Sequence, residues 1–248
     1  MFKLASIAIA IILFTPVSYA NLISVGTGDT NVVGSSPPEN DPGQFPGHRD
    51  EDNIVNGNGL ETNGAGQLIV NTGQPNGNNW NTTTSTADIT FDLGTVYDID
   101  FIQIWNFNDS FGNNDFGATS IDLLVSNVGT NAINADFSGS SVVAILSIAE
   151  ATGSLQYLGE NFRFNGKTEG EIPSIFGGVL NDFSALNLQG RFVRFANLDG
   201  STKFGGRTGL SEVRFYGNPS PVPVPAAFWL FGTALIGFVG FSRRRKAF

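Results

Sequence analysis

Few side chains in this 248-residue sequence belong to types that carry out covalent or metal chemistry. It has no cysteine, which excludes thiolate metal sites, cysteine nucleophiles and disulfides. Its single histidine, His48, lies in the charged stretch QFPGHRDED, where we expect a solvated loop side chain and not a general base. Asp109 and Asp115 could act as paired carboxylates in glycoside hydrolysis, but their spacing in a Gly/Asn-rich segment does not fix their separation. We therefore expect no enzyme.

A second kind of chemistry, the binding of sugar rings, needs an aromatic face and planar polar groups. The segments NNWNTTT and WNFNDSFGNND supply both. The candidate ligand-binding residues are Trp80, Asn106, Asn108, Asp109 and Phe111. Two other interpretations stay open, because Trp80 could cap the end of the domain and the Asn-rich segment could be a solvated turn. Trp105 lies in a long apolar run and is expected in the core.

The charge distribution excludes a further class of partner. All 22 acidic residues lie between Asp29 and Glu212, whereas five of the 13 Lys and Arg residues lie at the chain ends. The middle of the chain therefore carries eight bases against 22 acids, a net charge of −14. Because the neutralisation of phosphates requires a basic face, we expect no binding to nucleic acid.

The elements that must position these candidates look like strands, because short apolar runs alternate with Gly/Asn/Asp turns. The expected strands cover residues 87–93, 99–107, 121–126, 142–148, 192–198 and 210–216. Residues 144–151 could equally form a helical turn, and the segments 53–81 and 160–190 are expected to be long loops. Residues 21–217 are sufficient for one core, so the prediction is a single all-β domain.

The first 20 residues have the three parts of a secretory signal peptide. Lys3 gives the positive start, residues 4–14 are apolar, and the small residues Ser18 and Ala20 precede the expected cut. The protein is therefore expected to be exported.

The C-terminal end has the composition of a membrane segment. A Pro-rich spacer, 218–225, precedes 16 uncharged residues, 226–241, and a basic cluster closes the tail within 226–248. As a transmembrane helix the apolar stretch would span about 24 Å, slightly less than the ~30 Å hydrocarbon core of a bilayer. The basic cluster would stay cytoplasmic, which places residues 21–218 across the membrane.

This tail, VPVPAAFWLFGTALIGFVGFSRRRKAF, resembles the PEP-CTERM sorting signal of Gram-negative bacteria. The usual Pro-Glu-Pro is replaced by a sequence like the VPxPAA variant of that signal. The matching positions are Val224, Pro225, Ala226, Ala227, Arg243, Arg244 and Arg245. The resemblance implies recognition by an exosortase-type membrane protease, removal of the tail, and delivery to the cell surface or extracellular matrix.

The middle of the chain resembles the discoidin-type, galactose-binding-like domains. The resemblance rests on an opening segment, VNGNGL, and on five later motifs in order: ITFDLG, IQIWN, SIDLLVS, GRFVRF and GLSEVRFYG. It implies a jelly-roll β-sandwich that binds glycans or other surface ligands through loops at one end.

The same resemblance implies a structural calcium ion, held by carbonyls of the opening segment and by a glutamate of the closing strand. The corresponding positions here are Asn56, where family members often have an acid, and Glu212. Calcium prefers several oxygen ligands, so the missing charge weakens this prediction. The alternative is that Glu212 forms an ion pair with Arg194 or Arg214.

Together these features predict an exported, surface-sorted, non-catalytic protein that recognises extracellular polysaccharide or another surface glycan. Two alternatives remain: a structural matrix or biofilm protein without a defined glycan ligand, and an exported glycoside hydrolase. Burial of Trp80 and Phe111 would argue against binding by ring stacking.

Overall fold

The computed structural model describes residues 20–35, 50–70, 79–108, 116–151, 153, 156–168, 171, 173, 175–200 and 206–221. The chain forms two compact units, Met1–Asn218 and Pro219–Phe248. Every described strand lies in the first unit, apart from the last residue of β12. The only described helix is a 3-10 turn, η1 (Glu51–Ile54).

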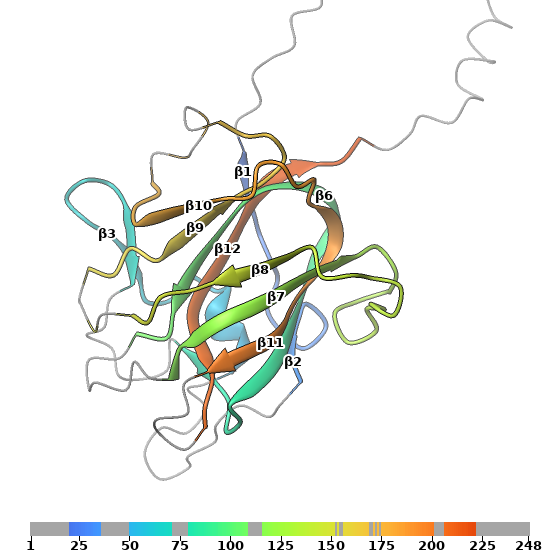
Figure 1. Ribbon diagram of the computed structural model, residues 1–248, viewed down its shortest axis with the longest axis horizontal. Helices are drawn as coiled ribbons and strands as arrows, with labels where there is room; N and C mark the ends of the chain where they lie inside the picture. Colours follow the sequence, from blue (N-terminus) through green and yellow to red (C-terminus); the bar gives the residue numbers. More distant parts are fainter. Residues whose placement is uncertain are drawn as a thin grey trace, which may run out of the picture. The chain divides into compact units, whose positions relative to one another are not determined.

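The strands form one ten-stranded sheet that folds over into two layers (Figure 1). In one layer, β2 (Val32–Gly34), the first part of β6 (Thr86–Asn106), β11 (Gln189–Gly200), β7 (Ala118–Ser126) and β8 (Ala144–Ser147) lie side by side. In the other, β10 (Val179–Asp182), β9 (Glu160–Arg163), the second part of β6 and β12 (Gly209–Pro219) follow one another. The short strands β1 (Asn21–Ile23) and β5 (Trp80–Asn81) pair with β12.

Strand β6, with 21 residues, belongs to both layers and connects them. Its first part pairs with β11, and its residues 101–104 pair with β9. Gly94, with φ of +84°, lies where the strand turns between the layers, in a backbone region that favours glycine. The sequence predicted two strands and a turn here, and the structure shows one continuous bent strand.

The core fills the space between the layers. The rings of Phe91, Phe195 and Phe215 meet there, with Phe91 5.1 Å from each of the other two ring centroids. Phe91 and Phe195 come from one layer and Phe215 comes from β12 in the other, so these three rings join the two layers of the sheet. Such aromatic pairs add stability beyond that of the buried area alone.

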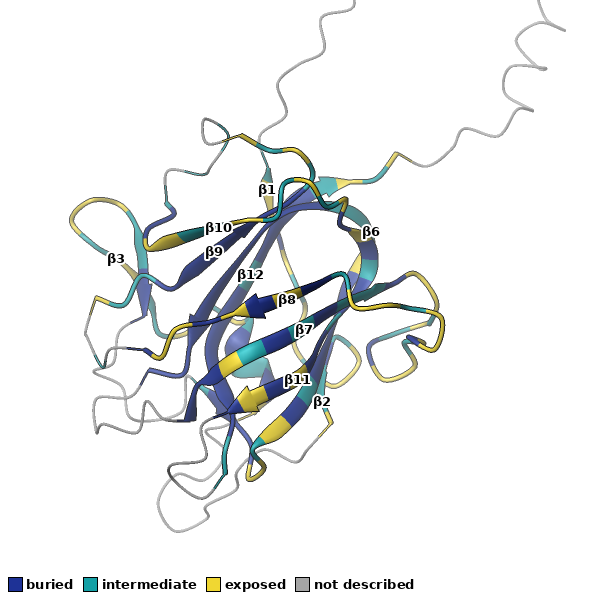
Figure 2. Ribbon diagram, viewed as in Figure 1, coloured by how far each residue is buried: buried dark blue, intermediate teal, exposed yellow. Residues whose placement is uncertain are grey.

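The all-β prediction is confirmed, and the described architecture is a sandwich of mainly antiparallel strands. Residues 144–147 are strand β8, which settles the choice between strand and helical turn. The prediction of a loop over 160–190 is wrong, because it contains β9 and β10, a parallel pair. All four residues of β9 are buried, so it shows no alternation that a sequence pattern could reveal (Figure 2). The expected loop 53–81 also contains short strands, including the hairpin of β3 (Leu60–Thr62) and β4 (Leu68–Val70).

Among the described residues, no helix is long and apolar enough to cross a membrane. The expected signal peptide and the apolar stretch 226–241 lie outside the described residues, apart from Ala20. The proposed division at residues 20, 217 and 225 therefore stays a prediction.

Candidate functional site: a polar pocket at one end of the sandwich

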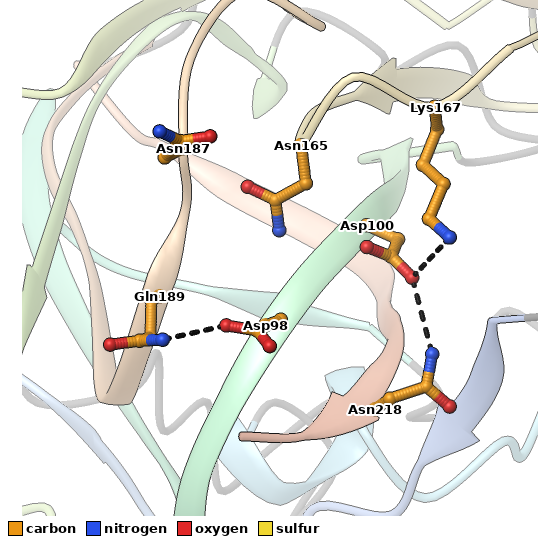
Figure 3. A pocket seen from close by; sticks show the side chains of 7 residues that line it. All are labelled: Asp98, Asp100, Asn165, Lys167, Asn187, Gln189 and Asn218. Atoms are coloured by element: carbon orange, nitrogen blue, oxygen red, sulfur yellow. Dashed lines mark hydrogen bonds and ion pairs between the residues drawn. The ribbon is translucent and has the colours of Figure 1, made fainter. Parts of the chain in front are cut away.

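A pocket of about 500 Å³ lies at one end of the sandwich (Figure 3). Four separate segments contribute to it: β6 just after its bend, the turn that follows β9, the start of β11 and the end of β12. Its lining residues are Asp98, Asp100, Asn165, Lys167, Asn187, Gln189 and Asn218. All seven are polar, which distinguishes this end from the apolar interior next to it. We refer to it as the pocket end.

Strand periodicity explains why β6 supplies two carboxylates. Asp98 and Asp100 are two residues apart and so share a face of the strand, whereas Ile99 between them is fully buried in the core. The sequence YDIDF therefore places polar groups at the end of the sandwich and an apolar anchor inside it.

Asn165 stabilises the backbone around the pocket by hydrogen bonds to two neighbouring segments. It has a positive φ of 55°, in a region that Asn tolerates better than most residues. Its side-chain amide donates hydrogen bonds to the carbonyls of Ile99 (3.0 Å) and Leu188 (3.1 Å), and its oxygen accepts one from the Leu188 amide. This one side chain ties β6 to the segment leading into β11.

Ion pairs and hydrogen bonds order the carboxylates. Lys167 Nζ lies 3.4 Å from Asp100 Oδ2, which also accepts a hydrogen bond from the Asn218 amide, and Gln189 donates one to Asp98 over 2.7 Å (Figure 3). Burial raises the pKa of Asp100 above its ordinary value, and the charge and hydrogen bond of Lys167 partly offset this. The buried carboxylate therefore depends on Lys167.

The arrangement suits the recognition of hydroxyl groups. Planar amides and carboxylates donate and accept hydrogen bonds in fixed directions, and Asn187 and Gln189 are both exposed to solvent. None of the described residues that line the pocket is aromatic, so the contacts that they offer are hydrogen bonds and ion pairs.

Of the two interpretations left open for Trp80, the structure supports the one in which its ring is buried and not available for stacking. Trp80 is fully buried and belongs to the main core, because β5 pairs with β12 and sets Trp80 opposite Leu210. Trp105 is also fully buried, as expected. Stacking on a sugar is thereby excluded for both indoles in this conformation.

Asn106 and Asn108 are also buried, and both have structural contacts. The Asn106 amide donates to the carbonyls of Ala118 (2.7 Å) and Ala149 (2.8 Å), and its oxygen accepts from the Phe107 amide. The Asn108 backbone amide donates to Ser211, and its side-chain oxygen accepts from the Gly153 amide. Asp109 and Phe111 lie outside the described residues.

The described candidates Asn106 and Asn108 lie at the opposite end of one strand pair from the pocket. Asp100 contacts Asn218 near the end of β12, whereas Asn108 contacts Ser211 near its beginning. From Asp98 to Asn106 the strand extends about 26 Å at the usual rise per residue. We refer to the second end as the Asn106 end.

Sequence reasoning missed the pocket because its residues are scattered from position 98 to position 218 and meet only through strand pairing. One signal could have indicated it. Two aspartates alternate with apolar residues inside a run that otherwise reads as a buried central strand, and such carboxylates need partners.

The side chains at the two positions expected to hold calcium both contact neighbouring groups of the chain. Asn56 is exposed, and its side-chain oxygen accepts a hydrogen bond from the Asn58 amide at 2.7 Å. Glu212 is 1% exposed, and Arg214 Nε lies 3.4 Å from its Oε1. Burial raises the pKa of Glu212 well above its ordinary value, and the Arg214 charge opposes this. Among the described residues, no group of three or more His, Cys, Asp or Glu residues could hold a metal ion.

Of the two ion pairs considered for Glu212, the structure shows the one with Arg214. Arg194 instead donates to Thr90 and stacks over the Phe137 ring.

Residues 221–246 match the family model of the PEP-CTERM protein-sorting motif. This confirms the prediction made from the tail, and the motif indicates an exported surface protein that is processed by an exosortase. The sorting residues from Val224 to Arg245 lie outside the described residues. No curated protein matches the chain.

Solved structures similar to this chain include carbohydrate-binding and lectin modules. One is CpGH89CBM32-5 from Clostridium perfringens, in complex with GalNAc-beta-1,3-galactose: 16% identity, TM-score 0.45, covering 79% of this chain and 99% of that chain. A second is the family 32 carbohydrate-binding module of C. perfringens NanJ with galactose: 14% identity, TM-score 0.42, covering 79% and 98%. A third is a Streptococcus pneumoniae fucose-binding module: 13% identity, TM-score 0.45, covering 80% and 96%. Likenesses at this level assign no ligand to this chain.

Proposed function

We propose that this is an exported, surface-sorted binding protein whose β-sandwich recognises extracellular polysaccharide through the pocket at the Asp98–Asn218 end. The observation that carries the proposal is the pocket itself, in which seven polar side chains from four segments surround about 500 Å³. This volume lies within the usual range for small-ligand sites. The sorting motif supports an extracellular ligand.

Sugar hydroxyls match this lining in chemistry. Each hydroxyl is both a donor and an acceptor, and the pocket offers carboxylate acceptors, amide groups that do both, and the Lys167 ammonium as a donor. Asn187 and Gln189, at the solvent-facing margin, would make the first contacts.

Charge favours neutral over acidic polysaccharide. The middle of the chain is strongly acidic, and two aspartates line the pocket against one lysine. A polyanionic glycan would therefore be repelled at low ionic strength.

Sorting supplies the remaining partners. Before processing, the apolar stretch 226–241 would hold the protein in the inner membrane, and an exosortase-type protease would then remove the tail. The protein would remain at the cell surface or in the matrix.

One observation favours a structural matrix protein without a defined ligand instead. The candidate stacking residue Trp80 is buried, and several pocket side chains pair with one another. In that case the pocket groups would serve only to join strand ends.

The test is binding by residues 20–221, which contain every described strand, against neutral, acidic and amine-bearing polysaccharides. The double variant Asn187→Ala/Gln189→Ala should weaken binding at least tenfold while the melting temperature changes by no more than about 4 °C. Asn134→Ala, an exposed amide outside the pocket, is the matched control and should bind normally. If the folded protein bound no polysaccharide in the panel, the proposal would fail.

A further inference from the structure

The opening segment, residues 55–60, meets the closing strand β12 at a junction that contains the buried carboxylate of Glu212. Both carboxylate oxygens of Glu212 are buried, and the groups that favour its charged form are the Arg214 guanidinium and the backbone amide of Gly57. A carboxylate removed from water is costly, so it either takes up a proton or is compensated by a cation.

The positive charge next to Glu212 is the side chain of Arg214. Arg214 lies two residues along the same strand, so it shares a face of β12 with Glu212. Its Nε is 3.4 Å from Glu212 Oε1, and its side chain is 20% exposed, so it reaches from the buried carboxylate toward the surface.

The same guanidinium rests on the opening segment. A Cβ atom added at Gly57 would lie only 2.6 Å from Arg214 Nη2, so the guanidinium sits directly against this glycine, whose φ is +74°. Arg214 thus contacts both the opening turn and the buried carboxylate. The Asn56 side-chain oxygen is already engaged within that turn.

A calcium ion would need about six to eight oxygen ligands at 2.3–2.6 Å. Here a guanidinium stands beside the one carboxylate, and two cations at that position would repel each other.

We propose that the Arg214 guanidinium takes the place of a metal ion at this junction. It connects the opening segment to the closing strand, so that the domain needs no divalent ion there. Arg suits this role because its charge is permanent and its planar group tolerates partial burial.

The first test uses unaltered residues 20–221 and compares melting temperatures in EDTA, in millimolar calcium and in magnesium at equal ionic strength. The three values should agree within about 1 °C. A rise of several degrees that is specific to calcium would overturn the proposal.

The second test removes the cation. Arg214→Met should lower the melting temperature by about 5–10 °C, because Glu212 is left buried without its counter-charge. Arg214→Lys, which keeps the charge, should lose less. The double variant Arg214→Met/Glu212→Gln should recover at least half of the loss, since neither charge then remains.

These variants also show whether Arg214 stabilises the domain through its charge or only through packing. If Arg214→Met kept the normal melting temperature, or if the double variant were no more stable than Arg214→Met, the proposal would be wrong. Should Arg214→Met fail to fold, a folded double variant would itself support the proposal, and an unfolded one would count against it.

Discussion

The two ends of the sandwich use the same side-chain chemistry for opposite purposes. At the Asn106 end, Asn106 is fully buried and its amide satisfies neighbouring backbone groups. At the pocket end, Asn187 and Gln189 are exposed beside two aspartates and a lysine. An amide enclosed by strand ends stabilises the fold, whereas an amide at the margin of a pocket is available to a ligand. Residue type alone therefore does not reveal which role an asparagine has.

The largest expected effect on stability is that of removing the buried side-chain amide of Asn106. Asn106→Ala should lower the free energy of unfolding by about 3 kcal/mol, because it leaves the backbone groups of Ala118, Ala149 and Phe107 without this partner. Urea denaturation would measure this. Asn187→Ala at the other end is the control and should change stability by less than about 0.5 kcal/mol. Equal losses at the two ends would remove the distinction between them.

An intermediate loss of stability is expected when the Lys167–Asp100 ion pair in the pocket is removed. Lys167→Met should cost about 2 kcal/mol at pH 7, because Asp100 is then buried without its cation.

The loss should depend on pH in one direction. Burial already raises the pKa of Asp100 in the folded state, so its charged form is unfavourable there and protonation relieves the cost. The deficit of Lys167→Met should therefore be largest near pH 7 and shrink as the pH falls through the raised pKa of Asp100. Unfolding curves from pH 7 to pH 4 would show this, and a deficit that grows toward acid would contradict it.

The smallest effect on stability should accompany the largest effect on binding. Asn187→Ala/Gln189→Ala removes exposed amides and one hydrogen bond, to Asp98, so stability should change by less than about 1 kcal/mol. Isothermal titration with the polysaccharide that binds best should show at least a tenfold weaker affinity. An unchanged affinity would move the binding site away from the pocket.

The sequence predicted those parts of the fold that depend on local patterns. Alternation in ADITFDL and the apolar run IDFIQIWNF correctly indicated the two halves of β6, and GLSEVRFYG indicated β12. Strands β9 and β10 were missed, because each has only four residues and their pairing links segments that no local pattern connects.

The candidate site was harder to predict because burial depends on pairing partners. Trp80 lies in a polar stretch and reads as exposed, yet its pairing opposite Leu210 draws it into the core. Apart from the two aspartates of YDIDF, no local pattern marks the pocket residues, and only the antiparallel pairing of distant strands brings them to one end.

The most direct measurement is a polysaccharide titration of isotope-labelled residues 20–221, followed through the side-chain amide signals of asparagine and glutamine. Both ends of the sandwich carry such amides, so one spectrum compares them. We expect shifts at Asn187, Gln189 and Asn218, while the Asn106 amide and the Trp80 indole stay unchanged. Shifts confined to Asn106, Asn108 and Trp80 would contradict the assignment of binding to the pocket end.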